Sequence, residues 1–140
     1  FKNHDWGMGI QLVRTSILPD GLGLANHEEK TFSIRISAPE RAMLECLYLA
    51  PEKVDLVECA QVMEGLTTLR PKILQPLLEQ CSSIKVKRLF LYLASRAGPA
   101  WVKRLDTSRL ELGTGDRTVI KGGVYVAQYG ITVPKELVQL

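Results

Sequence analysis

Hydrophobic and polar residues alternate in the first part of the chain, which is the pattern of β-strands. The stretch TFSIRIS (31–37) places its apolar side chains at every second position, as a half-buried strand does. A looser alternation runs through MGIQLVRTSIL (8–18), and PDGLG (19–23) between the two is typical of a turn. We therefore expect two strands before residue 38.

The pattern changes to helical spacing at SAPERAMLECLYLA (37–50). The apolar positions follow the i, i+3, i+4, i+7 rule: Met43, Cys46, Leu47 and Ala50. Ser37 and Glu40 have the spacing of a capping box, and Pro39 lies in the first turn, where its missing N–H costs nothing. This stretch predicts a helix that starts at Ser37 and ends near Pro51.

Three further helical segments follow. Residues 56–64 come after a possible capping pair, Asp55 and Glu58, and end at Gly65. Residues 70–81 are helical in pattern, although Pro76 should kink or split them. Residues 83–98 form the strongest helix, with apolar residues around most of its circumference, and 99–105 add a short helical turn.

After Asp106 the pattern returns to short strand-like pieces separated by glycines. Two or three antiparallel strands with a hairpin near GTGD (113–116) fit residues 108–134. Strands, then helices, then strands predict a single α+β domain, in which a bundle of four to five helices packs with short antiparallel strands.

The bulk composition fits one ordinary domain with a proper core. The chain has 140 residues, of which 46% are hydrophobic and 24% charged. It contains no apolar run of membrane-spanning length and no apolar secretory segment at its start. Because it lacks an initiator Met, we expect a fragment or a processed chain. We expect the protein to be cytoplasmic, in keeping with the reduced thiols described next.

The cysteines and histidines give no familiar site. Cys46, Cys59 and Cys81 are separated by 13 and 22 residues, without a CxxC pair, and the only histidines are His4 and His27. We expect three reduced thiols, buried or half-buried, with no metal and no cofactor.

Charge is distributed unevenly along the chain. Residues 1–79 hold 8 Lys/Arg and 11 Asp/Glu, whereas residues 80–140 hold 10 Lys/Arg and 4 Asp/Glu. No acidic side chain occurs between Glu79 and Asp106. The asymmetry indicates an anionic partner for the second half.

The cations of the predicted 83–98 helix form a stripe. On a wheel of 100° per residue, its four polar members span about 80°; they are Lys85, Arg88, Tyr92 and Arg96. Lys103 and Arg104 follow shortly afterwards. We predict that these six residues bind nucleic acid through phosphate contacts and a tyrosine. The alternative is that the stripe is simply the solvated face of an otherwise apolar helix.

Catalytic motifs are not evident. The pairs GMG, GLG and GTG do not extend to GxGxxG, no GxxxxGK[ST] is present, and no Ser/His/Asp or Cys/His arrangement can be assigned. We therefore predict no catalytic residues. A hydrolase or nuclease that uses Glu40, Glu45 or Asp116 stays open as a minor alternative.

Several blocks together resemble the AbiEi antitoxin family. They are SAPERAMLECLYLAP (37–51), VMEGLTTLRPKILQPLLEQCSSIKVKRLFLYLA (62–94), LELGTGDR (110–117) and QYGITVP (128–134). The resemblance extends over roughly residues 6–134.

The resemblance implies a function in a type IV, abortive-infection toxin–antitoxin system. It implies that residues 1–140 are a C-terminal antitoxin domain, with an N-terminal winged-helix domain upstream, in a repressor that binds the DNA of its own operator. It also implies functional opposition to a nucleotidyltransferase toxin, and no enzymatic activity, membrane or cofactor. Self-association stays possible. The other reading is a protein-interaction or oligomerisation domain without nucleic-acid contact.

Overall fold

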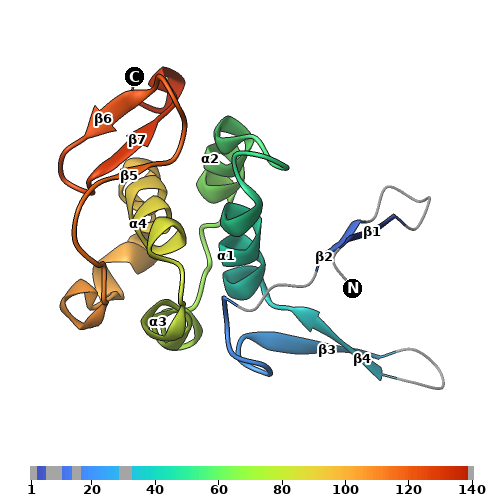
Figure 1. Cartoon of the computed structure of the whole chain (residues 1–140). Coiled ribbons are helices and arrows are strands. Elements are labelled where there is room, and N and C mark those ends of the chain that lie inside the picture. The colour runs from blue at the N-terminus through green and yellow to red at the C-terminus, as the bar shows by residue number, and fades with distance from the viewer. Residues whose placement is uncertain (1–2, 6–10, 14–16, 29–32, 139–140) are drawn as a thin grey trace.

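The structure is a computed structural model, and it describes residues 3–5, 11–13, 17–28 and 33–138 (Figure 1). Short strands precede and follow a group of helices, so the predicted α+β class is confirmed. The α-helices of the described ranges are α1 (Pro39–Leu49), α2 (Leu56–Gly65), α3 (Pro71–Gln80) and α4 (Ile84–Ala97). No helix in these ranges has the length and apolarity needed to cross a membrane.

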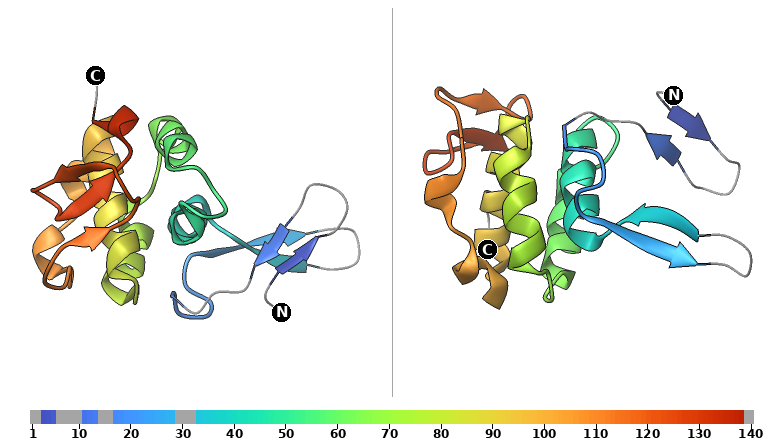
Figure 2. Two further views of the ribbon diagram at one scale, coloured as in Figure 1. Left: turned by 45° about the horizontal axis from the view of Figure 1, so that its top comes forward. Right: turned by 90° about the horizontal axis from the view of Figure 1, so that it is seen from below.

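The strands before α1 form two antiparallel pairs. β1 (Asn3–Asp5) pairs with β2 (Gln11–Val13), and β3 (Leu24–Glu28) pairs with β4 (Ser33–Ser37). The predicted strand 31–37 is confirmed over Ser33–Ser37, and its first two residues lie outside the described ones. Of the predicted strand 8–18, Gln11–Val13 form β2, whereas Ile17 and Leu18 lie in a bend and the other residues lie outside the described ones. The β3–β4 pair extends away from the helices (Figure 2).

The predicted capping box at the start of α1 is wrong. β4 continues through Ser37, which lies opposite Leu24 in the β-ladder, so the helix starts later, with Ala38 as an N-cap that has no side-chain bond. The Ser37 hydroxyl donates instead to Oε1 of Glu45 at 2.6 Å. Glu40 also turns away from the helix start, because a more distant arginine binds it, as described below.

The other helix ends agree closely with the sequence. Asp55 caps α2 by accepting from the backbone N–H of Val57 at 3.0 Å, and α2 ends at Gly65. α4 begins after Ser83, whose hydroxyl accepts a hydrogen bond from the backbone N–H of Val86. It ends at Gly98, which has a φ of 69°. The expected splitting of the third helix is not found, since α3 continues through Pro76.

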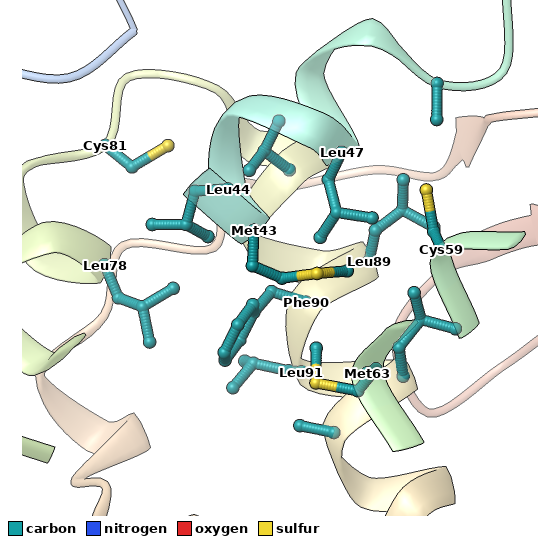
Figure 3. Close-up of a cluster of buried hydrophobic side chains, with 14 of the residues drawn as sticks. Met43, Leu44, Leu47, Cys59, Met63, Leu78, Cys81, Leu89, Phe90 and Leu91 are labelled. Atoms are coloured by element: carbon teal, nitrogen blue, oxygen red, sulfur yellow. The ribbon is translucent and has the colours of Figure 1, made fainter. Parts of the chain in front are cut away.

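The core lies among the helices α1, α2, α3 and α4 (Figure 3). All four contribute side chains: Met43, Leu44 and Leu47 of α1, Cys59 and Met63 of α2, Leu78 of α3, and Leu89, Phe90 and Leu91 of α4. Because α4 contacts α1, α2 and the C-terminal sheet, it is the central helix that the sequence predicts.

A small sheet and 3-10 turns complete the chain. The 3-10 helix η1 (Ala100–Arg104) follows α4, and the strands β5 (Arg117–Thr118), β6 (Val124–Val126) and β7 (Ile131–Val133) form a sheet of order β5-β7-β6. β5 pairs with β7 in parallel, and β6 pairs with β7 antiparallel. The hairpin therefore joins β6 to β7 at residues 127–130, and the predicted hairpin near GTGD (113–116) is wrong. The sheet covers α4 on the side away from β3 and β4 (Figures 1 and 2).

Candidate functional site

The four stripe residues of α4 all hydrogen-bond to backbone carbonyls of other segments. Lys85 is the first. Its ammonium donates to the carbonyls of Ala50 at 2.6 Å and Tyr48 at 3.2 Å, at the end of α1, and it lies 5.8 Å from the Tyr48 ring centroid. α1 has no basic residue in its last turn, so Lys85 supplies the positive charge that its carbonyl end favours. Burial lowers the pKa of Lys85, while the charge of Glu52 opposes that shift.

Arg88 is buried, with an exposed fraction of 6%, and it binds two loops of the C-terminal region. Its Nε donates to the Leu112 carbonyl at 2.9 Å, and its Nη1 donates to the carbonyls of Gly115 at 2.6 Å and Gly130 at 3.2 Å. The guanidinium fork therefore supplies donors to carbonyls of both loops, and the Gly130 carbonyl also accepts from the Arg117 backbone N–H at 2.8 Å. Arg88 holds the loop before β5 next to the turn between β6 and β7.

Tyr92 and Arg96 meet at a single acceptor near the C-terminus. The Tyr92 hydroxyl and Nε of Arg96 both donate to the Leu137 carbonyl, each at 2.8 Å. Arg96 also forms an ion pair with Glu64 of α2 at 3.2 Å. The Tyr92 ring contacts Tyr129 edge to face, at 5.9 Å between centroids. Burial raises the pKa of Tyr92, against the charge of Arg96.

Lys103 and Arg104 differ from the stripe because their side chains are exposed. Within the described part of the chain, neither has a hydrogen-bond or ion-pair partner. Trp101 anchors the 3-10 helix η1 that carries them: it is 4% exposed, donates from Nε1 to the Leu66 carbonyl at 2.7 Å and lies 5.8 Å from Phe90 between ring centroids. The backbone of η1 that carries Lys103 and Arg104 is thus held in place, while their two side chains extend into solvent.

The three carboxylates of the hydrolase or nuclease alternative, Glu40, Glu45 and Asp116, each accept hydrogen bonds within the protein. Glu40, 1% exposed, accepts from the Arg70 backbone N–H at 2.8 Å and from its guanidinium at 3.0 and 3.2 Å. Burial alone would raise the pKa of Glu40, but the hydrogen bonds from Arg70 outweigh it and hold that pKa below 4.5. Glu45 accepts from Ser37 and Arg41. Asp116 accepts from the Tyr125 hydroxyl at 2.9 Å, which raises the pKa of Tyr125.

Two of the hollows lined by described residues bear on the site. One, of about 270 Å³, lies above Arg88 and has a mixed polar and apolar lining that includes Asp116, Tyr125 and Gln128. The other, also about 270 Å³, is apolar and lies between α1 and α2, where Cys46 forms part of its wall. The described residues contain no group of three His, Cys, Asp or Glu side chains that could hold a metal ion.

One comparison decides the family. Residues 1–134 match the family described as transcriptional regulator, AbiEi antitoxin, type IV TA system. The chain belongs to this AbiEi antitoxin family. No curated protein and no solved structure matches the chain.

The AbiEi family membership confirms the resemblance seen in the sequence and gives the chain its class, a regulator and antitoxin of a type IV toxin–antitoxin system. No finding tests which of the six predicted residues touch nucleic acid, so that assignment stays a prediction. What the structure adds is that four of the six have intramolecular partners.

Sequence reasoning missed one arrangement in this AbiEi chain. The Sγ atoms of Cys46 and Cys59 lie 3.7 Å apart, although their separation of 13 residues matches no familiar motif. Both positions fall on apolar faces of neighbouring helices, and that was the only available signal that they could meet.

Proposed function

We propose that the chain contributes to autorepression and to toxin neutralisation in its type IV toxin–antitoxin system. The contribution to autorepression is binding of operator DNA, without catalysis. Family membership supports this proposal, and so does the acid-free interval between Glu79 and Asp106. The single observation that carries the DNA contact is the exposed basic pair Lys103 and Arg104 on an anchored turn, which has no partner among the residues that the structure describes.

The basic pair has the properties of a phosphate-contacting site. Lys103 and Arg104 are adjacent basic side chains, and no carboxylate of the described residues pairs with them. Trp101 restricts the movement of η1, so that little ordering is needed when the cations meet a backbone phosphate.

The stripe residues contribute indirectly in this proposal. Lys85 attaches α4 to the end of α1, while Arg88, Tyr92 and Arg96 attach α4 to the C-terminal segment. These contacts set the position of the helix from which η1 continues. The six predicted residues therefore divide into four that support the surface and two that contact phosphate.

The test is operator binding by the double variant Lys103→Glu, Arg104→Glu in the intact protein that carries this chain. If both cations contact phosphate, the slope of log affinity against log salt should decrease by about 2, since each phosphate contact contributes roughly 0.9. The matched control is Lys72→Glu, Lys135→Glu, which changes the net charge equally at two other exposed cations.

An equal loss of affinity in both double variants would show that only net charge matters. An unchanged slope in the Lys103→Glu, Arg104→Glu variant would remove η1 from the DNA contact. Toxin neutralisation is tested separately, by co-expressing the same variants with the neighbouring toxin. Growth rescue without operator binding would place the two activities on different surfaces.

A further inference from the structure

We propose that Cys46 and Cys59 form a redox modification site, at which a peroxide converts the two thiols to a disulfide between α1 and α2. The proposal is independent of the DNA contact, because it involves neither η1 nor α4.

The geometry of the pair carries the proposal. Cys46 projects from α1 and Cys59 from α2, and their Sγ atoms are 3.7 Å apart in a hydrogen bond. A disulfide needs about 2.05 Å between sulfurs. A small approach of two helices that already pack together therefore suffices, and no segment has to unfold.

Access to the pair is one-sided. Cys59 is completely buried, whereas Cys46 is half-buried and lines the apolar hollow between α1 and α2. Val62, which is 50% exposed, stands at the same hollow and shows that it opens to solvent. A small neutral oxidant such as hydrogen peroxide can reach Cys46 first and Cys59 only through it.

The protonation of the pair matches this order. The hydrogen bond from the Cys59 thiol lowers the pKa of Cys46 to about 7, although burial and the charge of Glu58 oppose the shift. The same hydrogen bond and burial raise the pKa of Cys59. Cys46 is therefore the thiolate near neutral pH, and Cys59 keeps its proton.

The reaction is balanced in two steps. The Cys46 thiolate attacks one peroxide oxygen and the O–O bond breaks; sulfur is oxidised to a sulfenic acid, peroxide is reduced, and the leaving hydroxide takes a proton to become water. Cys59 then loses its proton and attacks the sulfenic sulfur. The S–S bond forms, the S–O bond breaks, and the hydroxide leaves with that proton as a second water.

Cys81 is the internal control of the same chain. It is 3% exposed, its thiol is 3.7 Å from the Ser83 carbonyl, and burial raises its pKa. A thiol of pKa near 7 reacts several-fold faster at neutral pH than an ordinary thiol, roughly five- to tenfold once its lower intrinsic nucleophilicity is included. Cys46 should therefore react ahead of Cys81.

The experiment treats the reduced, intact protein with one equivalent of hydrogen peroxide and follows free thiols and peptide masses. This chain's free thiols should decrease from three to one, with a Cys46–Cys59 peptide link and a reduced Cys81. The rate should increase with pH through about 7, following the Cys46 thiolate. Cys46→Ala should keep both remaining thiols, while Cys81→Ala should oxidise like the unmodified chain.

In Cys59→Ala, a dimedone adduct should appear on Cys46, because no resolving thiol is left. This variant keeps the proposal testable if Cys46→Ala folds poorly. A disulfide to Cys81, a link between two chains, equal oxidation of all three thiols, or persistence of all three under peroxide would overturn the proposal.

Discussion

Arg88 illustrates how a single buried cation is used in this fold. Its guanidinium donates to three backbone carbonyls at 2.6 to 3.2 Å, and among the described residues it forms no ion pair with a carboxylate. A buried carbonyl without a donor costs free energy comparable to a lost hydrogen bond. The positive charge therefore stabilises loop structure, which explains why α4 tolerates it on a packed face.

Arg88→Met is expected to destabilise the protein by about 3 kcal/mol, because it removes a charged donor from the Leu112 and Gly115 carbonyls, while the Gly130 carbonyl keeps its bond from the Arg117 N–H. Arg88→Lys should recover little, since an ammonium cannot reproduce the fork. Urea unfolding measures both. The exposed Lys103→Met serves as control and should stay within about 0.5 kcal/mol of the unmodified chain; an equally small effect of Arg88→Met would contradict the structural role.

Glu40→Gln tests the buried carboxylate that binds Arg70. We expect the free energy of unfolding to decrease by about 1.5 kcal/mol near pH 7, where Glu40 is charged. The effect is this small because the Arg70 side chain is 57% exposed and solvent screens the ion pair. The folded-state pKa lies below the ordinary 4.5, so this contribution is present above that pH and is lost as pH decreases through the folded pKa. The difference between the two proteins in free energy of unfolding should therefore narrow as the pH decreases below 4.5. A constant difference would contradict the ionic contribution.

Elements that end at local signals were the most predictable part of the chain. Ser83 and Gly98 delimit α4 in both the sequence and the structure, because capping and a left-handed residue act within one helical turn. The prediction that Ser37 caps α1 was wrong for the opposite reason. Its local capping pattern competed with the β4 ladder and with Glu45, and these tertiary contacts prevailed.

Gly23, in the turn before β3, shows an element boundary set by packing. It has φ of 70°, and an added Cβ would lie 2.9 Å from Leu77 Cδ1 and 3.1 Å from Arg41 Cβ. Gly23→Ala should cost about 3 kcal/mol, from the left-handed backbone and from overpacking. Gly65→Ala, where a Cβ meets nothing within 4 Å, should be neutral or stabilise α2 by about 0.5 kcal/mol. Thermal unfolding distinguishes them, and similar changes in both variants would refute the packing argument.

At the scale of the whole molecule, contacts between distant segments were beyond the reach of the sequence. The stripe of α4 follows from helical periodicity, but its acceptors lie 24 to 45 residues further along the chain or 35 to 37 before it. The parallel β5–β7 pair and the Cys46–Cys59 contact have the same origin. No local sequence pattern encodes which loop covers which face of a helix. The fold class was therefore predictable, but the binding of the stripe residues to distant backbone carbonyls was not.

The C-terminal segment completes the surface of α4, although the family match ends at residue 134. Leu137 is 2% exposed, and its carbonyl receives both Tyr92 and Arg96. Ending the chain after Pro134 should therefore cost about 4 kcal/mol, from the lost leucine burial and the two hydrogen bonds.

Leu137→Ala separates these contributions, because it removes the side chain and keeps the carbonyl. It should cost about 2.5 kcal/mol, and the remainder of the truncation effect reports the two hydrogen bonds. Chemical unfolding measures both variants. If truncation and Leu137→Ala cost the same, the two hydrogen bonds to the Leu137 carbonyl contribute nothing to the free energy of unfolding, and Arg96 and Tyr92 are held by Glu64 and Tyr129 instead. If truncation costs more than Leu137→Ala, the bonds of Tyr92 and Arg96 to the C-terminal segment stabilise the helix from which η1 continues, which is the supporting role that the proposed function gives them.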